Sequence, residues 1–196
     1  MADSKTASNK TLTWIIEGAI IVLALLLGLA IRLGVYESAV IISRSMSPTL
    51  LVGDRLLIDH RNSLHGQWRR GDIIAFTPPL SWAVAEENGE AQGEQYVKRV
   101  IGLPGETVDV QAGATAINGL ALGEPYINQT PSPDEGLKRW TLGPDQYFVM
   151  GDNRANSADS RDHGPISDSD INGRAVRILA PLGRSGALKS PKYANP

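Results

Sequence analysis

A serine and a distant lysine are the residues of this chain whose types could carry hydrolytic chemistry. Ser45 lies in the polar run 43–50, and Lys98 lies in the apolar run 96–102. An alcohol is a weak nucleophile until a base takes its proton, and a neutral lysine amine can act as that base. The pair predicts attack on a carbonyl carbon by Ser45 with Lys98 as the general base. On its own segment, Lys98 beside Arg99 is more simply interpreted as a pair of edge-strand charges, and only the other motifs favour a base.

The lysine of such a pair must lose its proton at neutral pH. An ordinary lysine amine, with a pKa of about 10.4, is neutral roughly once in 2,500 molecules at pH 7. Burial against apolar neighbours favours the neutral amine. On an alternating strand, Lys98 shares one face with Tyr96 and Val100, while Arg99 points the opposite way. One cation can therefore be buried while the other stays solvated.

Other catalytic arrangements fit the sequence less well. No lysine follows Ser45 by three residues, and no Gly-x-Ser-x-Gly elbow is present. His163 lies near Asp159 and Asp162, but its flanks, residues 161–165, are typical of a polar turn and favour a surface or structural histidine. The chain has no cysteine, its three histidines lack metal-ligand spacing, and its net charge is −2 without a basic run interleaved with aromatics. We therefore expect no metal, no cofactor and no nucleic-acid partner.

An apolar segment precedes the serine. Residues 14–35 predict one helix of about 33 Å, close to the bilayer's hydrocarbon thickness of about 30 Å. The uncharged stretch 18–31 is also short enough to be the h-region of a cleaved signal peptide, with a small-x-small site at 28–30. A buried soluble helix is the third interpretation. We expect a retained anchor, because of the motifs that follow it.

The flanking charges predict an orientation and a location. Lys5 and Lys10 precede the segment, and Arg32 lies in its distal part, so the positive-inside rule places the N-terminus in the cytoplasm and the main domain outside. The short polar N-terminus favours a single-pass protein of a bacterial cytoplasmic membrane, an internal membrane being the alternative. The expected organisation is a polar, disordered N-terminus at 1–11, a transmembrane anchor at 12–36, an extracytoplasmic domain at 37–183 with a small cap subdomain at about 104–140, and a flexible tail at 184–196.

Beyond the anchor, short apolar-rich runs separated by turn residues predict a mainly β fold. No long amphipathic helix interrupts these runs. The expected architecture is a β-rich catalytic domain with a small cap, anchored by one N-terminal transmembrane helix. The predicted strands cover residues 39–43, 54–59, 72–76, 96–102, 106–110, 146–150 and 174–180.

Four short motifs follow one another along the chain, and they resemble a known family. They are Ser-x-Ser-Met-x-Pro-Thr-Leu at 43–50, Gly-Asp-Arg-Leu-Leu at 53–57, Tyr-Val-Lys-Arg-Val-Ile-Gly-Leu-Pro-Gly at 96–105, and Gly-Asp-Asn-Arg with Ser-x-Asp-Ser-Arg within 151–161. In order and spacing they closely resemble the type I signal peptidases, which are serine proteases with a Ser/Lys dyad. The resemblance runs from the anchor to the neighbourhood of Pro181.

The resemblance implies a role for each catalytic position. Ser45 would be the nucleophile, and Lys98 would be the general base that later protonates the leaving amine. The backbone N–H of Ser45 and the hydroxyl of Ser43 would form the oxyanion hole. Ser157 would hold the Lys98 amine in line, although Ser157 read alone is equally a turn residue.

Two further groups of residues follow from the same resemblance. Asp159 and Arg161 would brace the Ser157 loop as an ion pair, although Asp159 alone could equally bond its own backbone in a turn. Apolar residues beside the serine and the lysine would line shallow pockets for small side chains, and ordinary core packing is their simpler interpretation without the resemblance. The expected substrate-binding residues are Ile41, Ile42, Met46, Leu50, Tyr96 and Val97.

The chain departs from the family pattern at a few positions. Ile42 stands where the family usually has proline, and Arg44 replaces a small residue between the two serines. Ala155 replaces a frequent asparagine, and His163 replaces an aromatic residue. None of these positions is the proposed nucleophile or base.

The activity implied by the resemblance is that of a membrane-anchored endopeptidase. It would remove N-terminal signal peptides from exported preproteins after an Ala-x-Ala-like site, through an acyl-enzyme. Its expected partners are preprotein signal peptides, the lipid bilayer and the protein export machinery. Two alternatives stay open. One is a specialised Ser/Lys maturation peptidase for a single secreted, pilus or conjugation protein, and the other is a non-catalytic membrane-anchored β domain that binds a partner.

Overall fold

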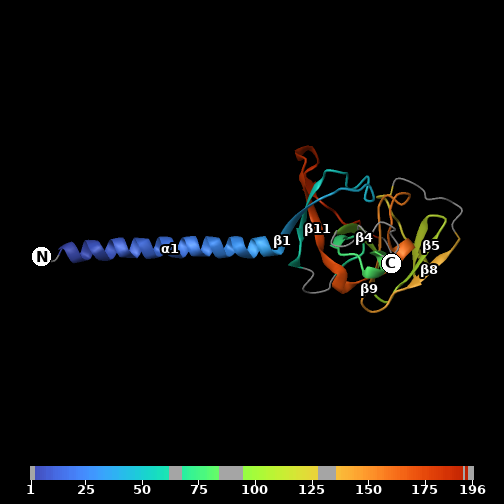
Figure 1. Cartoon of the computed structure of the whole chain (residues 1–196), viewed down its shortest axis with the longest axis horizontal. Helices are drawn as coiled ribbons and strands as arrows, with labels where there is room; N and C mark the ends of the chain where they lie inside the picture. The colour runs from blue at the N-terminus through green and yellow to red at the C-terminus, as the bar shows by residue number, and fades with distance from the viewer. Residues whose placement is uncertain (1–2, 62–67, 84–94, 128–135, 192, 194–196) are drawn as a thin grey trace. The chain divides into compact units, whose positions relative to one another are not determined.

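The chain forms two compact units, residues 1–37 and residues 38–196 (Figure 1). The computed structural model describes residues 3–61, 68–83, 95–127, 136–191 and 193. We describe each unit by itself.

The first unit consists mainly of one helix, α1 (Asp3–Val35). Its described apolar side chains between Trp14 and Leu29 are exposed. The expectation of a disordered N-terminus at 1–11 is wrong for the described residues, because the helix begins at Asp3. Adding residues to a helix is much easier than nucleating one, so the apolar segment can extend its helix into the polar residues before it. No helix in the described ranges combines the length and the apolar character that crossing a membrane requires. The anchor at 12–36 therefore stays a prediction.

The second unit confirms the mainly β expectation. Its larger sheet has the strand order β1-β2-β11-β3-β4-β9-β10, with β12 paired to β11. The strands are β1 (Tyr36–Val40), β2 (Arg55–Asp59), β3 (Ile73–Phe76), β4 (Tyr96–Gly102), β9 (Gln146–Met150), β10 (Ile166–Ser167), β11 (Ile171–Ala180) and β12 (Gly186–Ala187).

Strand β4 lies inside the larger sheet, between β3 and β9. Lys98 faces Ile74 on β3 across the antiparallel ladder, and Arg99 is paired with Met150 on β9. All residues of β4 from Lys98 to Gly102 are buried. Because both edges of the strand are hydrogen-bonded, its position is fixed from two sides and its two cations cannot reach solvent at a sheet edge.

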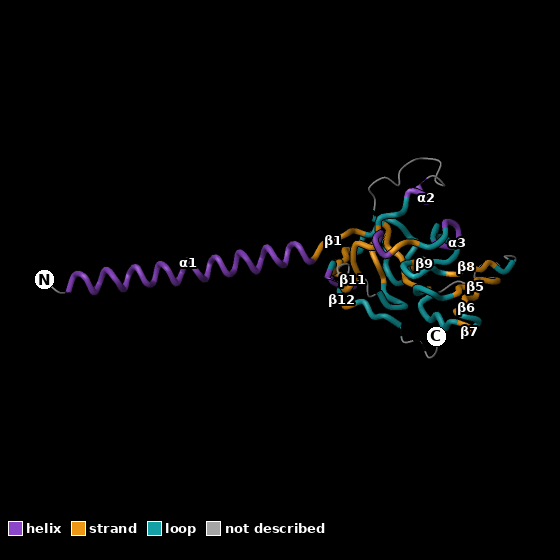
Figure 2. The backbone as a smooth tube through the Cα atoms, turned by 90° about the horizontal axis from the view of Figure 1, so that it is seen from below, coloured by secondary structure: helices purple, strands orange, loops and turns teal. Residues whose placement is uncertain are grey.

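A smaller sheet corresponds to the predicted cap at 104–140. Its strand order is β7-β6-β5-β8, and Figure 2 shows these strands gathered together. Asn118 and Gly119 form the two-residue loop between β6 and β7 with φ values of 52° and 81°. Such a hairpin turn needs positive φ at both positions, which Asn-Gly adopts at low cost. The strands are β5 (Thr107–Gln111), β6 (Ala114–Ile117), β7 (Leu120–Ala121) and β8 (Lys138–Thr141).

The two sheets share a hydrophobic cluster. Val108 and Ile117 of the smaller sheet pack with Ile101, Phe148 and Met150 of the larger one. These side chains are fully or almost fully buried. The smaller sheet is thus packed against β4, which carries Lys98, and against β9, after which the 151–161 loop begins.

Short helical turns connect the strands. Helix α3 follows the Gly-Asp-Asn-Arg motif, and its N-cap Asp159 forms a capping box with Asp162. This arrangement satisfies backbone N–H groups that a short helix would otherwise leave unpaired. The short helices are α2 (Leu80–Ala83), α3 (Ser160–His163), η2 (Asp168–Asp170) and η3 (Leu182–Arg184).

Each predicted strand overlaps an observed one. The boundaries differ most at 39–43 and at 174–180, since β11 begins at Ile171. The first predicted strand, 39–43, is shifted, because β1 covers Tyr36–Val40. Strands β6, β7, β8, β10 and β12 were not predicted, because they contain only two to four residues each and show little alternation.

The flexible tail predicted at 184–196 is wrong for its described residues. Gly186 and Ala187 form β12 and pair with Ile178 and Arg177 of β11. Farther on, Ser190 donates a hydrogen bond to Asp72. A Gly- and Ser-rich composition lowers the tendency to order but does not prevent docking where a strand edge offers partners.

Candidate active site

The turn that carries Ser45 is held against the Gly-Asp-Asn-Arg motif by hydrogen bonds from the backbone N–H and the side-chain amide of Asn153. The N–H of Asn153 donates to the carbonyl oxygen of Ser45 at 2.9 Å, and the Asn153 amide donates to the carbonyl oxygen of Arg44 at 3.1 Å. Met46 and Leu50 are buried in the hydrophobic core. The turn is therefore fixed from below by apolar packing and from one side by residue 153.

Asp152 connects the Ser45 turn to strand β4. Its carboxylate accepts a hydrogen bond from the Thr49 hydroxyl at 2.5 Å. It also accepts from Arg99 Nε at 2.8 Å and from Arg99 Nη2 at 2.6 Å, and both side chains are almost fully buried. Burial would lower the pKa of Arg99, but the hydrogen bonds and charge of Asp152 outweigh it and raise that pKa above its ordinary value. Arg99 is therefore a permanently charged structural cation.

The structure buries both neighbouring cations of β4. Lys98 is 4% exposed and Arg99 is 1% exposed. The expectation that one of them stays solvated is therefore wrong. A guanidinium can be buried when a carboxylate neutralises it with two hydrogen bonds, and Asp152 does this for Arg99.

Ser157 is the side chain that contacts the Lys98 amine. Lys98 Nζ donates to Ser157 Oγ at 3.0 Å, and Ser157 Oγ donates to Asp159 Oδ2 at 2.8 Å. A hydroxyl has a single proton to give, so Ser157 presents only lone pairs to Lys98 once that proton is directed at Asp159. The hydroxyl thus fixes the direction of one N–H of the amine.

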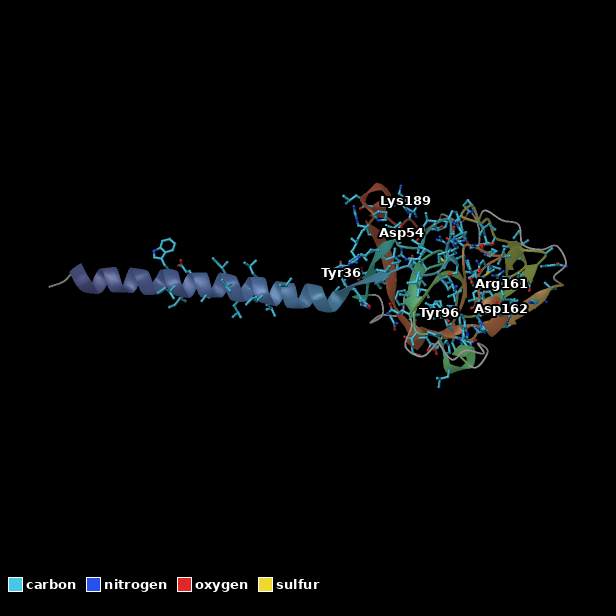
Figure 3. All side chains as sticks on the ribbon, turned by 45° about the horizontal axis from the view of Figure 1, so that its top comes forward. Tyr36, Asp54, Tyr96, Arg161, Asp162 and Lys189 are labelled. Atoms are coloured by element: carbon cyan, nitrogen blue, oxygen red, sulfur yellow. The ribbon has the colours of Figure 1, made fainter. Side chains whose placement is uncertain are left out.

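Asp159 is a fully buried carboxylate whose oxygens accept hydrogen bonds from several donors. It accepts from Arg161 Nε at 2.8 Å and from the backbone N–H of Gly151 at 2.9 Å. Burial would raise the pKa of Asp159, but the hydrogen bonds and charge of Arg161, labelled in Figure 3, lower it below its ordinary value. The predicted Asp159–Arg161 ion pair is present in the structure.

Gly151 is the point where the serine segment and the lysine's partner meet. A Cβ atom at this position would lie 2.5 Å from the carbonyl oxygen of Ser45 and 2.6 Å from Ser157 Cβ, with Ser157 Oγ closer still. Only glycine allows such an approach. Ser45 and the Ser157 hydroxyl that holds Lys98 therefore lie against the same residue from different segments.

The two serines of the turn face one another. Ser43 Oγ and Ser45 Oγ lie 3.1 Å apart, and Ser45 is partly exposed whereas Lys98 is buried. A hydroxyl donor beside the nucleophile is where a developing oxyanion needs one. The turn thus presents two neighbouring hydroxyls, one of them partly exposed, and the Lys98 amine is buried.

The residues predicted to bind substrate fall into distinct environments. Ile41, Met46 and Leu50 are buried in one core cluster, and the partly buried Val97 packs against the same cluster. Tyr96 instead makes edge-to-face ring contacts with Phe76 and Trp82, and Ile42 is 72% exposed. Ile41, Met46, Leu50 and Val97 are thus brought together. Their contact with substrate stays a prediction.

Sequence reasoning missed the buried partners of the two arginines in this region. Arg99 pairs with Asp152, and Arg154 Nη1 donates to Glu124 Oε2 at 2.9 Å with both side chains almost fully buried. The motif Gly-Asp-Asn-Arg contains one acid and one base within three positions, which is the available signal that this loop forms buried ion pairs. It could not have shown where the partners lie.

His163 has a packing role that its sequence environment did not suggest. Its ring lies 5.0 Å, centroid to centroid, from the ring of Trp82, at an angle of 31°. The expected surface or structural histidine is thus a ring-packing residue at the end of α3. A flat ring at this position explains how histidine can replace an aromatic residue there.

Comparison with known proteins places this site in a family. The family model described as "Signal peptidase, peptidase S26" matches residues 12–180. The signal peptidase I of Leptolyngbya laminosa is 43% identical over 169 residues, which span 86% of this chain and 81% of that protein. The signal peptidase I T of Bacillus subtilis (strain 168) is 38% identical over 187 residues, 91% of each chain. A crystal structure of a signal peptidase I from Enterococcus faecalis covers 58% of this chain and 97% of its own at 30% identity, with a TM-score of 0.44. The chain therefore belongs to the signal peptidase family, peptidase S26, and is a serine endopeptidase.

Proposed function

We propose that this protein removes N-terminal signal peptides from exported preproteins by a Ser45/Lys98 dyad, cutting after an Ala-x-Ala-like site. The observation that carries the proposal is the meeting of three segments at Gly151. The buried Lys98 is held there by Ser157, and the backbone of Ser45 packs against the same glycine.

The reaction begins with a proton transfer. Neutral Lys98 Nζ takes the hydroxyl proton of Ser45 as Ser45 Oγ forms a bond to the scissile carbonyl carbon. The resulting oxyanion receives hydrogen bonds from the Ser45 N–H and the Ser43 hydroxyl. The Lys98 ammonium then gives its proton to the leaving amine, the C–N bond breaks, and the signal peptide remains bound to Ser45 as an ester.

A water molecule completes the cycle. Lys98, neutral again, takes one proton from the water as its oxygen attacks the ester carbonyl. The ester C–O bond breaks, and the proton on Lys98 returns to Ser45 Oγ. The products are the regenerated dyad and the signal peptide's carboxylic acid, which releases its proton to solvent and leaves as the carboxylate.

The charges around Lys98 favour this role. Burial of the amine disfavours its charged form, because an ammonium loses hydration there. The nearest carboxylate in the hydrogen-bonded chain, Asp159, is already neutralised by Arg161 and reaches Lys98 only through the Ser157 hydroxyl. Asp159 therefore orients the amine through the Ser157 hydroxyl.

The proposal includes a membrane location with the N-terminus cytoplasmic and the second unit outside. It is supported by the exposed apolar side chains of α1 in the range Trp14–Leu29, among them Leu23 and Leu25 at 68% and 69% exposed. Bilayer lipid and the export machinery are the partners this location supplies. Alkaline extraction of cell membranes, followed by protease treatment of intact spheroplasts, tests it. Release of the intact full chain by alkali would contradict an anchor.

The activity is tested with the full-length chain in detergent and a preprotein carrying an Ala-x-Ala site. We expect cleavage by the wild type and background cleavage by Ser45→Ala and Lys98→Ala. The matched controls are Ser169→Ala and Lys138→Ala, which change exposed residues outside the site. Equal cleavage by all five proteins would point to a contaminant. No cleavage by any folded variant in the presence of lipid would favour the non-catalytic binding domain.

A specialised maturation peptidase is the second candidate. The exposed Arg44 beside the nucleophile supports it, because a cation at that position could restrict which residues flank the cleavage site. A panel of unrelated preproteins separates the two candidates. Cleavage of most of the panel fits a general enzyme, and cleavage of one member fits the specialised one.

A further inference from the structure

The C-terminal residues lie against the backbone that precedes strand β3. We define the C-terminal strap as residues 188–191 and 193. The backbone N–H of Leu188 donates to the carbonyl oxygen of Val176 at 2.9 Å, and the Ser190 hydroxyl donates to Asp72 Oδ1 at 2.9 Å. The strap is thus tied at two points before it reaches Tyr193.

Gly71 brings the strap and Arg99 together. A Cβ atom on Gly71 would lie 2.8 Å from Pro191 Cδ and 3.0 Å from Tyr193 Cε2, and its φ is +88°. The carbonyl oxygen of the same glycine accepts a hydrogen bond from Arg99 Nη1 at 2.8 Å. The residue covered by the strap is therefore one that fixes the buried arginine next to Lys98.

Tyr126 forms a second link between the strap and Arg99. The Tyr193 hydroxyl donates to the Tyr126 hydroxyl at 3.2 Å, which in turn donates to Glu124 Oε1 at 2.8 Å. The Arg99 guanidinium carbon lies 4.1 Å from the centroid of the Tyr126 ring, the geometry of a cation–π contact. Glu124 is also the partner of Arg154. Tyr126 thus contacts Arg99 directly and is linked to Arg154 through Glu124.

The two phenols act as fixed hydrogen-bonding groups. Burial raises the pKa of Tyr126 and of Tyr193 above the ordinary value for tyrosine. Both phenols therefore stay protonated across the pH range in which enzymes are assayed. The hydrogen bond between the two phenols therefore persists across that pH range.

We propose that Tyr193, acting through Tyr126 and Gly71, is a positioning residue for the reaction of the Ser45/Lys98 dyad. This inference rests on the proposed function. Tyr193 touches neither the nucleophile nor the base. It holds Arg99 in place from two sides, and Arg99 is the neighbour of Lys98 on β4. Loss of the strap loosens β4 at Lys98, so that the amine is less often aligned with Ser45 while the substrate still binds.

The test uses four variants of the full-length chain. Tyr193→Ala removes the ring and the hydroxyl, and Tyr193→Phe keeps the ring on Gly71 and removes only the hydrogen bond. Tyr126→Phe removes the acceptor hydroxyl and keeps the ring over Arg99, which preserves the test if Tyr193→Ala fails to fold. Lys189→Ala changes an exposed residue of the same strap and is the matched control.

Two readouts distinguish positioning from a merely structural role. For Tyr193→Ala we expect kcat on a preprotein to fall about tenfold with KM within about twofold, because misalignment acts after binding. Tyr193→Phe and Tyr126→Phe should lose about threefold in kcat, and Lys189→Ala should match the wild type. Hydrogen exchange of the backbone amides at 97–100 should be faster by about tenfold in Tyr193→Ala and unchanged in Lys189→Ala.

Several results would overturn the proposal. Wild-type kcat in Tyr193→Ala would do so, as would a rise in KM at constant kcat or unchanged exchange at 97–100. If the wild type cleaves no preprotein, the proposed function fails, but the exchange measurement still decides the role of Tyr193. Faster exchange in Tyr193→Ala supports the strap as a device that positions β4, and unchanged exchange contradicts it.

Discussion

The two faces of strand β4 bury neighbouring cations in opposite ways. On one face, Lys98 is held by the neutral hydroxyl of Ser157, and the carboxylate of Asp159 lies one hydrogen bond farther away. On the other face, Arg99 receives the carboxylate of Asp152 directly, with two hydrogen bonds. A base must be able to lose its proton, whereas a structural cation must never lose it. Under the proposed function, the difference means that the hydrogen-bonding partner, rather than burial alone, decides which role a buried cation can take.

Removing the charge on each face in turn tests whether Lys98 and Arg99 have these different roles. Lys98→Met should lower kcat by about 10⁴-fold, because it removes the proposed base of Ser45. Its free energy of unfolding should change by less than about 1.5 kcal/mol, because a methionine of similar volume replaces an amine whose partner is a neutral hydroxyl. Steady-state kinetics and urea unfolding measure the two quantities. Activity within tenfold of wild type would mean that Lys98 is not the base.

The opposite face should respond in its stability. Arg99→Met leaves the Asp152 carboxylate buried and unpaired, so we expect a loss of roughly 3–5 kcal/mol in the free energy of unfolding. The double variant Arg99→Met/Asp152→Leu removes both charges and should recover most of that loss. Chemical denaturation of the three proteins provides the comparison. A double variant as unstable as Arg99→Met would show that packing, and not the orphaned charge, carries the effect.

A smaller effect is expected from the group that separates Lys98 from Asp159. Ser157→Ala removes the acceptor of the Lys98 amine, which should reduce kcat about 10- to 100-fold, equivalent to about 1.4–2.7 kcal/mol. Ser169→Ala, an exposed serine outside the site, is the control. If Ser157→Ala kept full kcat, the amine would be oriented by other contacts.

The smallest predicted effect is a pH dependence that comes from Asp159. Its pKa is lowered in the folded chain, so its contribution to stability is fully present above the unfolded value of about 3.9 and is lost as the pH falls from that value through the lower folded pKa. Asp159→Asn should flatten the decline of stability below about pH 4. Part of the decline should remain, because hydrogen bonds from Arg61 also lower the pKa of Asp59. Urea unfolding at several pH values checks this, and identical slopes for both proteins would contradict it.

The motifs around Ser45 and Lys98 predicted the parts of the site that local sequence controls. Ser157 and Asp159 lie where the resemblance placed them, and their hydrogen bonds to Lys98 and Arg161 are present. The fold class and the longer strands were also predictable, because five to seven alternating or apolar residues carry a strand signal of their own.

What the sequence could not predict is which distant residues become partners. Arg99 and Asp152 are 53 positions apart, and Tyr126 and Tyr193 are 67 positions apart. Neither pair has a local signature, since each exists only after β4, the smaller sheet and the tail have come together. The same reason explains the docked tail, where Ser190 finds Asp72 at a separation of 118 positions.

The topology of β11 also has a consequence for the order of events during synthesis. This strand pairs with β2 and β3, whose paired residues are made 95 to 125 positions earlier, and it completes the middle of the larger sheet. Contacts between such distant segments form slowly, because a long loop must close before they stabilise the fold. We therefore expect the second unit to remain unfolded until residues 171–180 have left the ribosome. If the second unit lies outside the membrane, as the proposed location requires, its late folding keeps the chain unfolded while it is translocated.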